Sequence, residues 1–262
     1  MDDGSIDESV ATLQKIRDTR VRTLFAKQQR GLAASLNQIT KLANGKYIAR
    51  MDADDLMHPE RLERQIQLLE ARPELDGVGC GLIVLDRAQV PIGSRVLPAE
   101  HEEICNSPLE GFRIAHATFV GRADWFRAHA YNEANHGCED WELWVSSFRT
   151  SRFANLPDLL YFYREFDSFA LNKYVRKKAD FAARLLSKGR EFGTMRALVA
   201  SAKQYAHIAL YAGAARMGQT DRLLRRRNDP LEEPEVDDAL ETLRTIQGTV
   251  LPDLDESPVM DE

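Results

Sequence analysis

The stretch YIARMDADDLMHPERL, residues 47–62, decides the fold because it joins an apolar segment to a helix start through a group of carboxylates. Asp52, Asp54 and Asp55 lie within four positions of one another, and like charges this close repel. Packing does not need three acids at a strand end, whereas a hard divalent cation such as Mg²⁺ or Mn²⁺ takes oxygen ligands. The sequence therefore predicts a metal site, and the alternative is an acidic turn that caps the helix beginning near Pro59.

The segments around this stretch alternate between helical and extended patterns. Apolar spacing predicts helices over residues 8–18, 31–45 and 58–74 and strands over residues 20–27, 46–52 and 76–86. This order predicts an α/β fold with a mixed, mainly parallel sheet flanked by helices. The acids then fall at the carboxyl end of a strand, where open α/β sheets bind their ligands.

The buried faces of two of these helices can be read from the same spacing. The expected apolar stripes are Leu32, Leu36, Ile39 and Leu42 in the first, and Leu62, Ile66 and Leu69 in the second. Both stripes are expected to pack on the sheet.

A second group of acids stands in GCEDWELWVSSF, residues 137–148. Glu139 and Asp140 precede aromatic residues at helical spacing, so they fall at a helix N-terminus, where the dipole favours negative charge. One interpretation is a plain acidic helix start. The other is a general base that takes a proton from a hydroxyl group within hydrogen-bond reach.

Composition limits the class of protein. The chain has 262 residues and a net charge of −6, which does not favour non-specific binding to nucleic acid. Its three cysteines are far apart, which predicts reduced thiols and a cytoplasmic setting. No apolar run approaches the roughly 18–20 residues of a membrane span.

The second half of the chain changes in character. Residues 171–230 have helical spacing and predict a helical extension, and residues 231–262 predict an acidic, partly disordered tail. A basic cluster lies between these parts: Arg222, Arg225, Arg226 and Arg227. It is either an ordinary charged surface or a peripheral contact with anionic lipid at the cytoplasmic face of a membrane.

Several stretches follow, in order, the pattern of the family-2 glycosyltransferases of GT-A fold: DDGSID, GLAASLNQITKLANGKYIARMDADDLMHPERLERQIQLLEARPE, HATFVGRADWF, CEDWELW and FANLPDLLYFYRE. The chain resembles this family over roughly residues 1–168, which implies a Rossmann-like GT-A domain over residues 1–170. Members transfer a sugar from a nucleotide-diphosphate donor, usually with inversion, using Mg²⁺ or Mn²⁺. The resemblance thus implies a hexosyltransferase of polysaccharide or glycolipid biosynthesis in a bacterium.

The resemblance also implies roles for the first acids. Asp3 corresponds to the acid that contacts the nucleoside base, and Asp52 and Asp54 to the D-x-D pair that contacts the ribose or the metal–diphosphate. Asp55 is a further candidate metal ligand. The expected donor is a nucleotide-diphospho-sugar, foremost a UDP-sugar.

On the acceptor side, Asp140 corresponds to the catalytic base, with Glu139 beside it, and Arg164 to a residue near the active site. His116 lies in the acceptor-side segment, where a structural role is expected. The expected partners are the donor and a glycan or lipid-linked acceptor, and not nucleic acid.

The chain departs from the family pattern at its start, because Met1 directly precedes the DDGS loop. A β-α-β unit of roughly 30 residues is expected before this loop. A misassigned start, a true truncation, or strands supplied by another chain each account for this. A truncated, inactive glycosyltransferase-like protein and a nucleotidyltransferase are the alternative functions that the sequence leaves open.

Overall fold

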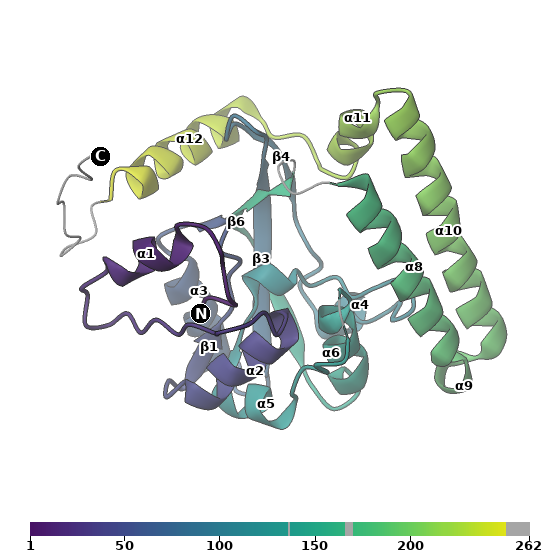
Figure 1. The fold of residues 1–262 in the computed structure, drawn as a ribbon, viewed down its shortest axis with the longest axis horizontal. Coiled ribbons are helices and arrows are strands. Elements are labelled where there is room, and N and C mark those ends of the chain that lie inside the picture. Colours follow the sequence, from purple (N-terminus) through teal and green to yellow (C-terminus); the bar gives the residue numbers. More distant parts are fainter. Residues whose placement is uncertain (136, 166–169, 250–262) are drawn as a thin grey trace.

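A six-stranded mixed sheet forms the centre of the computed structural model, which describes residues 1–135, 137–165 and 170–249 (Figure 1). The strands are β1 (Tyr47–Ala49), β2 (Leu56–Met57), β3 (Gly77–Leu85), β4 (Pro91–Arg95), β5 (Val120–Arg122) and β6 (Phe153–Arg164). Their order is β1-β5-β3-β6-β2, and β4 pairs with β3.

The prediction of a mainly parallel sheet is wrong. Among the described strands only β3 and β6 pair in parallel, and the other pairs are antiparallel. Residue patterns locate strands but do not give their direction. A short turn joins β3 to β4, where Asp86 donates to the carbonyl group of Val90, and such a tight connection requires an antiparallel pair.

The central strand β3 is buried along its whole length, as its continuous apolar run predicts. A side chain at Gly77 would place its Cβ 2.1 Å from the ring of Phe119. Phe119 is fully buried and meets Trp125, Trp144 and Phe153 in edge-on ring contacts. The small residues of β3 thus leave room for the aromatic side chains that pack against the sheet.

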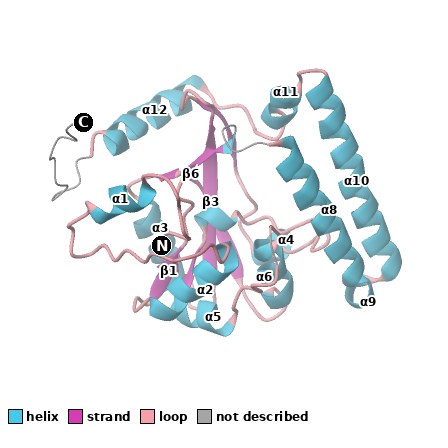
Figure 2. Ribbon diagram, in the orientation of Figure 1, coloured by secondary structure: helices cyan, strands magenta, loops and turns pink. Residues whose placement is uncertain are grey.

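The helices of the first half lie around the sheet, although α1 buries none of its own residues (Figure 2). They are α1 (Ser9–Gln14), α2 (Leu32–Leu42), α3 (Arg61–Ala71), α4 (His101–Ile104), α5 (Ala123–Ala128) and α6 (Glu139–Ser147), with the short 3₁₀ helix η1 (His116–Thr118). The strand predicted over residues 20–27 does not form, because only Phe25 makes a ladder contact, a single parallel bridge to Asp2.

The buried face of α2 differs from the predicted stripe. Leu32 and Leu42 are exposed, whereas Ala33 and Asn37 are buried. The side chain of Asn37 bonds both backbone groups of Tyr131, donating to its carbonyl oxygen and accepting from its N–H. These hydrogen bonds orient α2 so that its small residues face the core. The spacing of apolar residues could not predict this orientation, because Asn37 is polar.

The inward face of α3 also differs, since Arg61 and Gln65 are fully buried beside Leu69. The predicted Leu62 and Ile66 are only partly buried. A charged residue in a helix is normally assigned to solvent, so the pattern placed the stripe one position too far along the chain.

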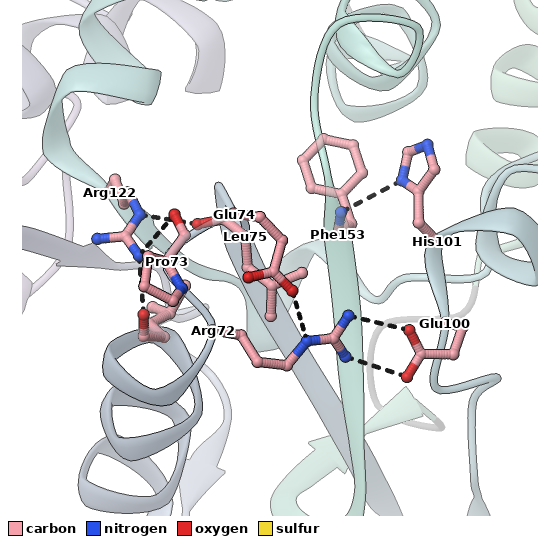
Figure 3. Close-up of polar contacts among 9 residues, drawn as sticks. Arg72, Pro73, Glu74, Leu75, Glu100, His101, Arg122 and Phe153 are labelled. Carbon is pink, nitrogen blue, oxygen red and sulfur yellow. Dashed lines mark hydrogen bonds and ion pairs between the residues drawn. The ribbon is translucent and has the colours of Figure 1, made fainter.

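Polar contacts at one end of the sheet fix α3 and α4 to it (Figure 3). Arg122 donates to the carbonyl groups of Leu69 and Leu75 at 2.8 and 2.7 Å, which satisfies carbonyls at the end of α3. On the other side, the backbone N–H of Phe153 donates to Nδ1 of His101 at 3.2 Å.

The second half of the chain is helical over most of its described length. Its helices are α8 (Leu171–Ser187), α9 (Gly189–Phe192), α10 (Thr194–Arg216), α11 (Thr220–Arg225) and α12 (Glu233–Gln247). Helices α8 and α10 form an antiparallel pair at the side of the molecule (Figure 1). No described helix combines the length and apolar character needed to cross a membrane.

The predicted acidic, partly disordered tail contains a helix over residues 233–247. They form α12, which a capping box of Glu232 and Glu235 begins and whose Ala239 and Leu243 pack on the sheet strands. The many acids of this segment favoured the prediction of disorder, although apolar residues recur at every third to fourth position, as in an amphipathic helix. Residues 250–262 of the predicted tail lie outside the described residues.

Candidate active site

The predicted acidic turn follows β1 as expected, although the two-residue strand β2 separates it from α3. One ligand oxygen from each of Asp52, Asp54 and Asp55 can be chosen so that all three lie within 4.8 Å of one another. The turn therefore gathers three carboxylates at the sheet edge, as its sequence predicts.

Asp55 is buried beneath this turn. Its Oδ2 accepts a hydrogen bond from the hydroxyl group of Tyr161 and its Oδ1 accepts one from the backbone N–H of Arg164, both at 2.8 Å. Burial raises the pKa of Asp55 to about 6, although these two hydrogen bonds act in the opposite direction. Asp55 thus ties the turn to β6.

Asp52 and Asp54 are the more accessible carboxylates. Asp52 forms a two-pronged ion pair with Arg50, and one of its two bonds measures 2.8 Å. The carboxylate of Asp54 is exposed and pairs with no residue of the described ranges. A free carboxylate beside a second one provides the oxygen donors that Mg²⁺ or Mn²⁺ prefers, so these residues fit such a cation.

Residues that the sequence did not indicate support the turn from below. Arg61 donates to the carbonyl oxygen of Arg50 at 2.8 Å and lies over the ring of Tyr161, with its Cζ 5.1 Å from the centroid. Gln65 accepts from Arg61 Nε and donates to the carbonyl groups of Val78 and Thr118. These bonds join the acidic turn to β3.

The second acid pair lies at the first turn of α6. Asp140 accepts a 2.8 Å hydrogen bond from the N–H of Trp141, and Glu139 accepts one of 2.7 Å from the N–H of Gly137. Glu139 is therefore tied to the preceding loop. Asp140 is half-buried, and the described residues leave its second oxygen without a partner.

Both acid groups face one cavity of about 1160 Å³. The predicted site residues along its wall are Asp52, Asp54, Glu139, Asp140 and Arg164. The two other predicted site residues, Asp3 and Asp55, are not among its lining residues. Asp3 instead accepts hydrogen bonds from the N–H groups of Arg30 and Gly31 before α2, and its contact with a nucleoside base stays a prediction.

Arg164 holds the acidic turn and reaches across to the β3–β4 turn. Its guanidinium group donates to the carbonyl oxygen of Asp54 at 2.9 Å and to Oε1 of Gln89 at 3.1 Å. His116 also lines the cavity, where its Nε2 lies 2.8 Å from the hydroxyl oxygen of Tyr131. Burial holds the pKa of His116 well below its usual range, which fits the structural role expected for it.

Cations from distant parts of the chain complete the cavity. They are Arg50, Arg95, Lys173, Arg176, Lys177 and Arg227. Arg95 and Arg227 both pair with the buried carboxylate of Glu165, the latter at 2.8 Å. The predicted basic cluster of residues 222–227 therefore does not form one surface, because Arg227 lines the cavity and its other arginines do not. Sequence spacing gave no signal for these residues.

A second hollow of about 440 Å³ adjoins the cavity and shares Asp140 with it. Its walls carry Phe112, Trp141 and Phe181, together with the cations Lys173, Lys177 and Lys178, the first two of which also face the main cavity. Asp140 thus stands between a space that reaches the acidic turn and a space with aromatic walls.

Comparisons with known proteins relate the chain to glycosyltransferases. Residues 1–126 match the family model of glycosyl transferase family 2. The chain is 35% identical over 179 residues to the putative glycosyltransferase EpsE of Bacillus subtilis, which is 66% of this chain and 63% of that protein. It is 31% identical over 176 residues to an uncharacterized glycosyltransferase of Haemophilus influenzae, covering 63% of this chain and 54% of that protein. The chain thus spans less than two thirds of both relatives.

The fold resembles that of the mannosyltransferase PcManGT from Pyrobaculum calidifontis, solved in complex with GDP-Man and Mn²⁺. The TM-score is 0.51 at 16% identity, over 94% of this chain and 74% of that one, so the likeness concerns the fold. The chain therefore has the GT-A fold, and its residues 1–126 belong to glycosyltransferase family 2.

Proposed function

We propose that this chain transfers a sugar from a nucleotide-diphosphate donor to a hydroxyl acceptor, with inversion at the anomeric carbon. One observation carries the proposal: Asp52 and Asp54 line the same cavity as Asp140. A carboxylate pair for a cation and a separate carboxylate for a proton are the two groups that a single displacement needs.

Asp54 and Asp52 would hold Mn²⁺ or Mg²⁺, which neutralises charge on the leaving diphosphate. Arg50 keeps Asp52 in place through their ion pair, and Arg164 fixes the backbone at Asp54. The buried Asp55 supports both from behind, so its own role is to position the turn. The donor nucleotide is a uridine or guanosine diphosphate, and the titration below separates these two.

Asp140 would act as the general base. Its carboxylate takes the proton of the acceptor hydroxyl group while that oxygen bonds to the anomeric carbon. The bond from this carbon to the diphosphate oxygen breaks at the same time, on the opposite face of the sugar. The diphosphate leaves with the electron pair, and the protonated Asp140 later releases its proton to water.

The acceptor would enter from the hollow with aromatic walls. The rings of Trp141 and Phe112 offer apolar faces to a sugar ring or a lipid-linked glycan, and Lys173 and Lys177 offer charge to polar groups. This hollow shares Asp140 with the main cavity, so an acceptor hydroxyl there has the base beside it.

Calorimetric titration tests the donor site. UDP and GDP are titrated into the chain with and without Mn²⁺, and one of them is expected to bind only when the metal is present. Asp54→Asn removes one negative charge and should weaken this binding at least tenfold, since one lost charge contact of about 1.5–3 kcal/mol has that effect.

Two variants serve as controls. Asp124→Asn makes the same change at an exposed position on α5 and should leave binding unchanged. Asp140→Asn should keep nucleotide binding and lose transfer. Nucleotide binding that is independent of both Mn²⁺ and Asp54 would contradict the proposal.

A further inference from the structure

Helix α10 has its two sides reversed relative to an ordinary surface helix. Apart from the aromatic Tyr211, the residues it buries against its neighbours are small or polar: Ala197, Ala200, Ser201, Gln204 and Ala214. The large apolar residues point away from the protein: Met195, Leu198, Val199, Tyr205, Leu210 and, just past the helix end, Met217. A helix that only covers a domain places its large apolar residues inward.

The outward residues form one continuous face. They are one to seven positions apart, and at 3.6 residues per turn they all fall within one half of the helix circumference over about 35 Å. Each is between 49% and 72% exposed. An apolar surface of this length on a water-soluble domain marks a contact with something else.

The charge on α10 itself has a single sign, although Lys203 forms an ion pair with Glu110 of the neighbouring segment. Helix α10 carries Arg196, Lys203 and Arg216 and no Asp or Glu. From Gly189 to Arg225 there are six Lys and Arg residues and two acids, although the whole chain has a net charge of −6. This segment therefore has few acids and a net positive charge, in contrast to the chain as a whole.

Two hollows border the face, one toward each end of α10. The first, of about 360 Å³, combines Met195 and Val199 with Arg196 and Lys203. The second, of about 390 Å³, combines Leu210 and Met217 with cations of the following helix, Arg222 and Arg226. Apolar floors bordered by cations occur at both ends, and Glu110 also lines the first hollow.

We propose that the outer face of α10 lies on an anionic lipid surface. Its apolar side chains would enter the boundary between headgroups and acyl chains, and the flanking cations would meet lipid phosphate groups. This contact is independent of sugar transfer. The sequence predicted a membrane contact through the basic cluster of residues 222–227. The proposed contact surface is instead the apolar face of α10, and only Arg222 and Arg226 of that cluster border it.

The charge pattern separates this surface from a second copy of the chain. Two α10 faces packed together would bring Arg196, Lys203 and Arg216 of both copies into one interface without acids from either helix. Like charges placed across an interface are unfavourable, whereas an anionic lipid surface supplies the missing opposite charge.

Co-sedimentation with lipid vesicles tests the proposal on the full chain. The vesicles contain either phosphatidylcholine alone or phosphatidylcholine and phosphatidylglycerol in equal parts. We expect binding to the anionic vesicles and at least tenfold weaker binding to the neutral ones. Raising the salt concentration should weaken the anionic binding further, because exposed charges are then screened.

Two sets of variants locate the contact. Leu198→Gln combined with Leu210→Gln should reduce binding at least about tenfold, because less apolar surface is removed from water. Arg196→Gln combined with Arg216→Gln should reduce it roughly fivefold or more on anionic vesicles alone. Val21→Gln changes a similarly exposed apolar residue between α1 and α2, on the other side of the molecule, and should have no effect (Figure 1).

Unchanged melting temperatures would show that these exposed substitutions leave the fold intact. Failure of the chain to bind anionic vesicles would overturn the proposal, and so would binding that persists with glutamine at both leucine positions. Light scattering measures whether the chain forms a dimer. If the chain is a dimer that the leucine substitutions dissociate, and if it does not bind vesicles, the outer face of α10 would be assigned to a contact with a second copy.

Discussion

The hydroxyl group of Tyr161 donates a 2.8 Å hydrogen bond to the buried carboxylate of Asp55 and accepts one of 3.2 Å from the N–H of Asp52. One side chain of β6 therefore holds both ends of the acidic turn. The accessible Asp54 lies between these two anchors, so its position depends on a residue more than 100 positions later in the chain.

Tyr161→Phe tests this anchoring. The variant keeps the ring over which Arg61 lies and loses both hydrogen bonds, so the unfolding free energy should fall by about 1–3 kcal/mol. We expect Mn²⁺ affinity, measured by calorimetry, to fall as well, because the turn loses its fixed shape. Tyr163→Phe, on the same strand, should leave Mn²⁺ affinity unchanged, and equal losses in both variants would contradict this role of Tyr161.

Arg61 is expected to contribute strongly to stability. It is fully buried, and its guanidinium group donates hydrogen bonds to Gln65 Oε1 and to the carbonyl oxygens of Arg50 and Ala117. Lysine cannot reproduce this planar set of donors, so Arg61→Lys should lower the unfolding free energy by roughly 3 kcal/mol in urea denaturation. Arg64→Lys, on the exposed side of the same helix, should cost less than about 1 kcal/mol. Similar losses in both variants would show that the buried network is not selective for arginine.

Much of the site could be predicted from local sequence. The acids of residues 52–55 follow a strand and Asp140 begins a helix, and both placements follow from patterns within a few residues. Tyr161 and Arg227 could not be found in this way. They reach the site only through the pairing of β6 with β2 and the packing after α11, which are long-range contacts.

The helix faces show where periodicity fails. A charged residue in a helix is normally expected to face solvent, so apolar periodicity did not predict that Arg61 of α3 is buried. Leu198 and Tyr205 of α10 have the spacing of an apolar stripe, and the structure exposes both. Periodicity identifies the side of a helix that is apolar, but it does not say whether the protein itself covers that side.

Helix α12 should be a cooperative part of the fold. Leu243 is buried between this helix and the sheet, so Leu243→Ala should lower the unfolding free energy by about 2–4 kcal/mol. Leu186→Ala, at an exposed leucine of α8, should cost less than about 1 kcal/mol. Chemical denaturation followed by circular dichroism gives both values. An effect of Leu243→Ala no larger than that of Leu186→Ala would place α12 outside the cooperative fold.

His101 should make stability depend on pH. Burial lowers its pKa below the usual 6.5, helped by Arg152, and its Nδ1 accepts a hydrogen bond from Phe153 only when unprotonated (Figure 3). The unfolded chain therefore binds this proton more readily. The stabilisation is complete above pH 6.5 and is lost as the pH falls through the lowered pKa.

The matched variant for this prediction is His101→Gln, which keeps an acceptor for the Phe153 N–H but does not titrate. Glu102 and Asp76 also face His101, and they are unchanged in the variant. Its unfolding free energy, measured by denaturation at several pH values, should fall less steeply below pH 6.5 than that of the natural chain. Parallel pH profiles would assign the acid sensitivity to other groups.

We propose that one cavity holds a metal-bound donor beside Asp54 and a base at Asp140. The most direct test of this proposal is the anomalous scattering of manganese in crystals grown with Mn²⁺ and the nucleotide that binds. We expect one manganese peak within bonding distance of the Asp54 carboxylate, with the diphosphate in the cavity that Asp140 lines. A nucleotide bound without manganese at Asp54, or outside this cavity, would contradict it.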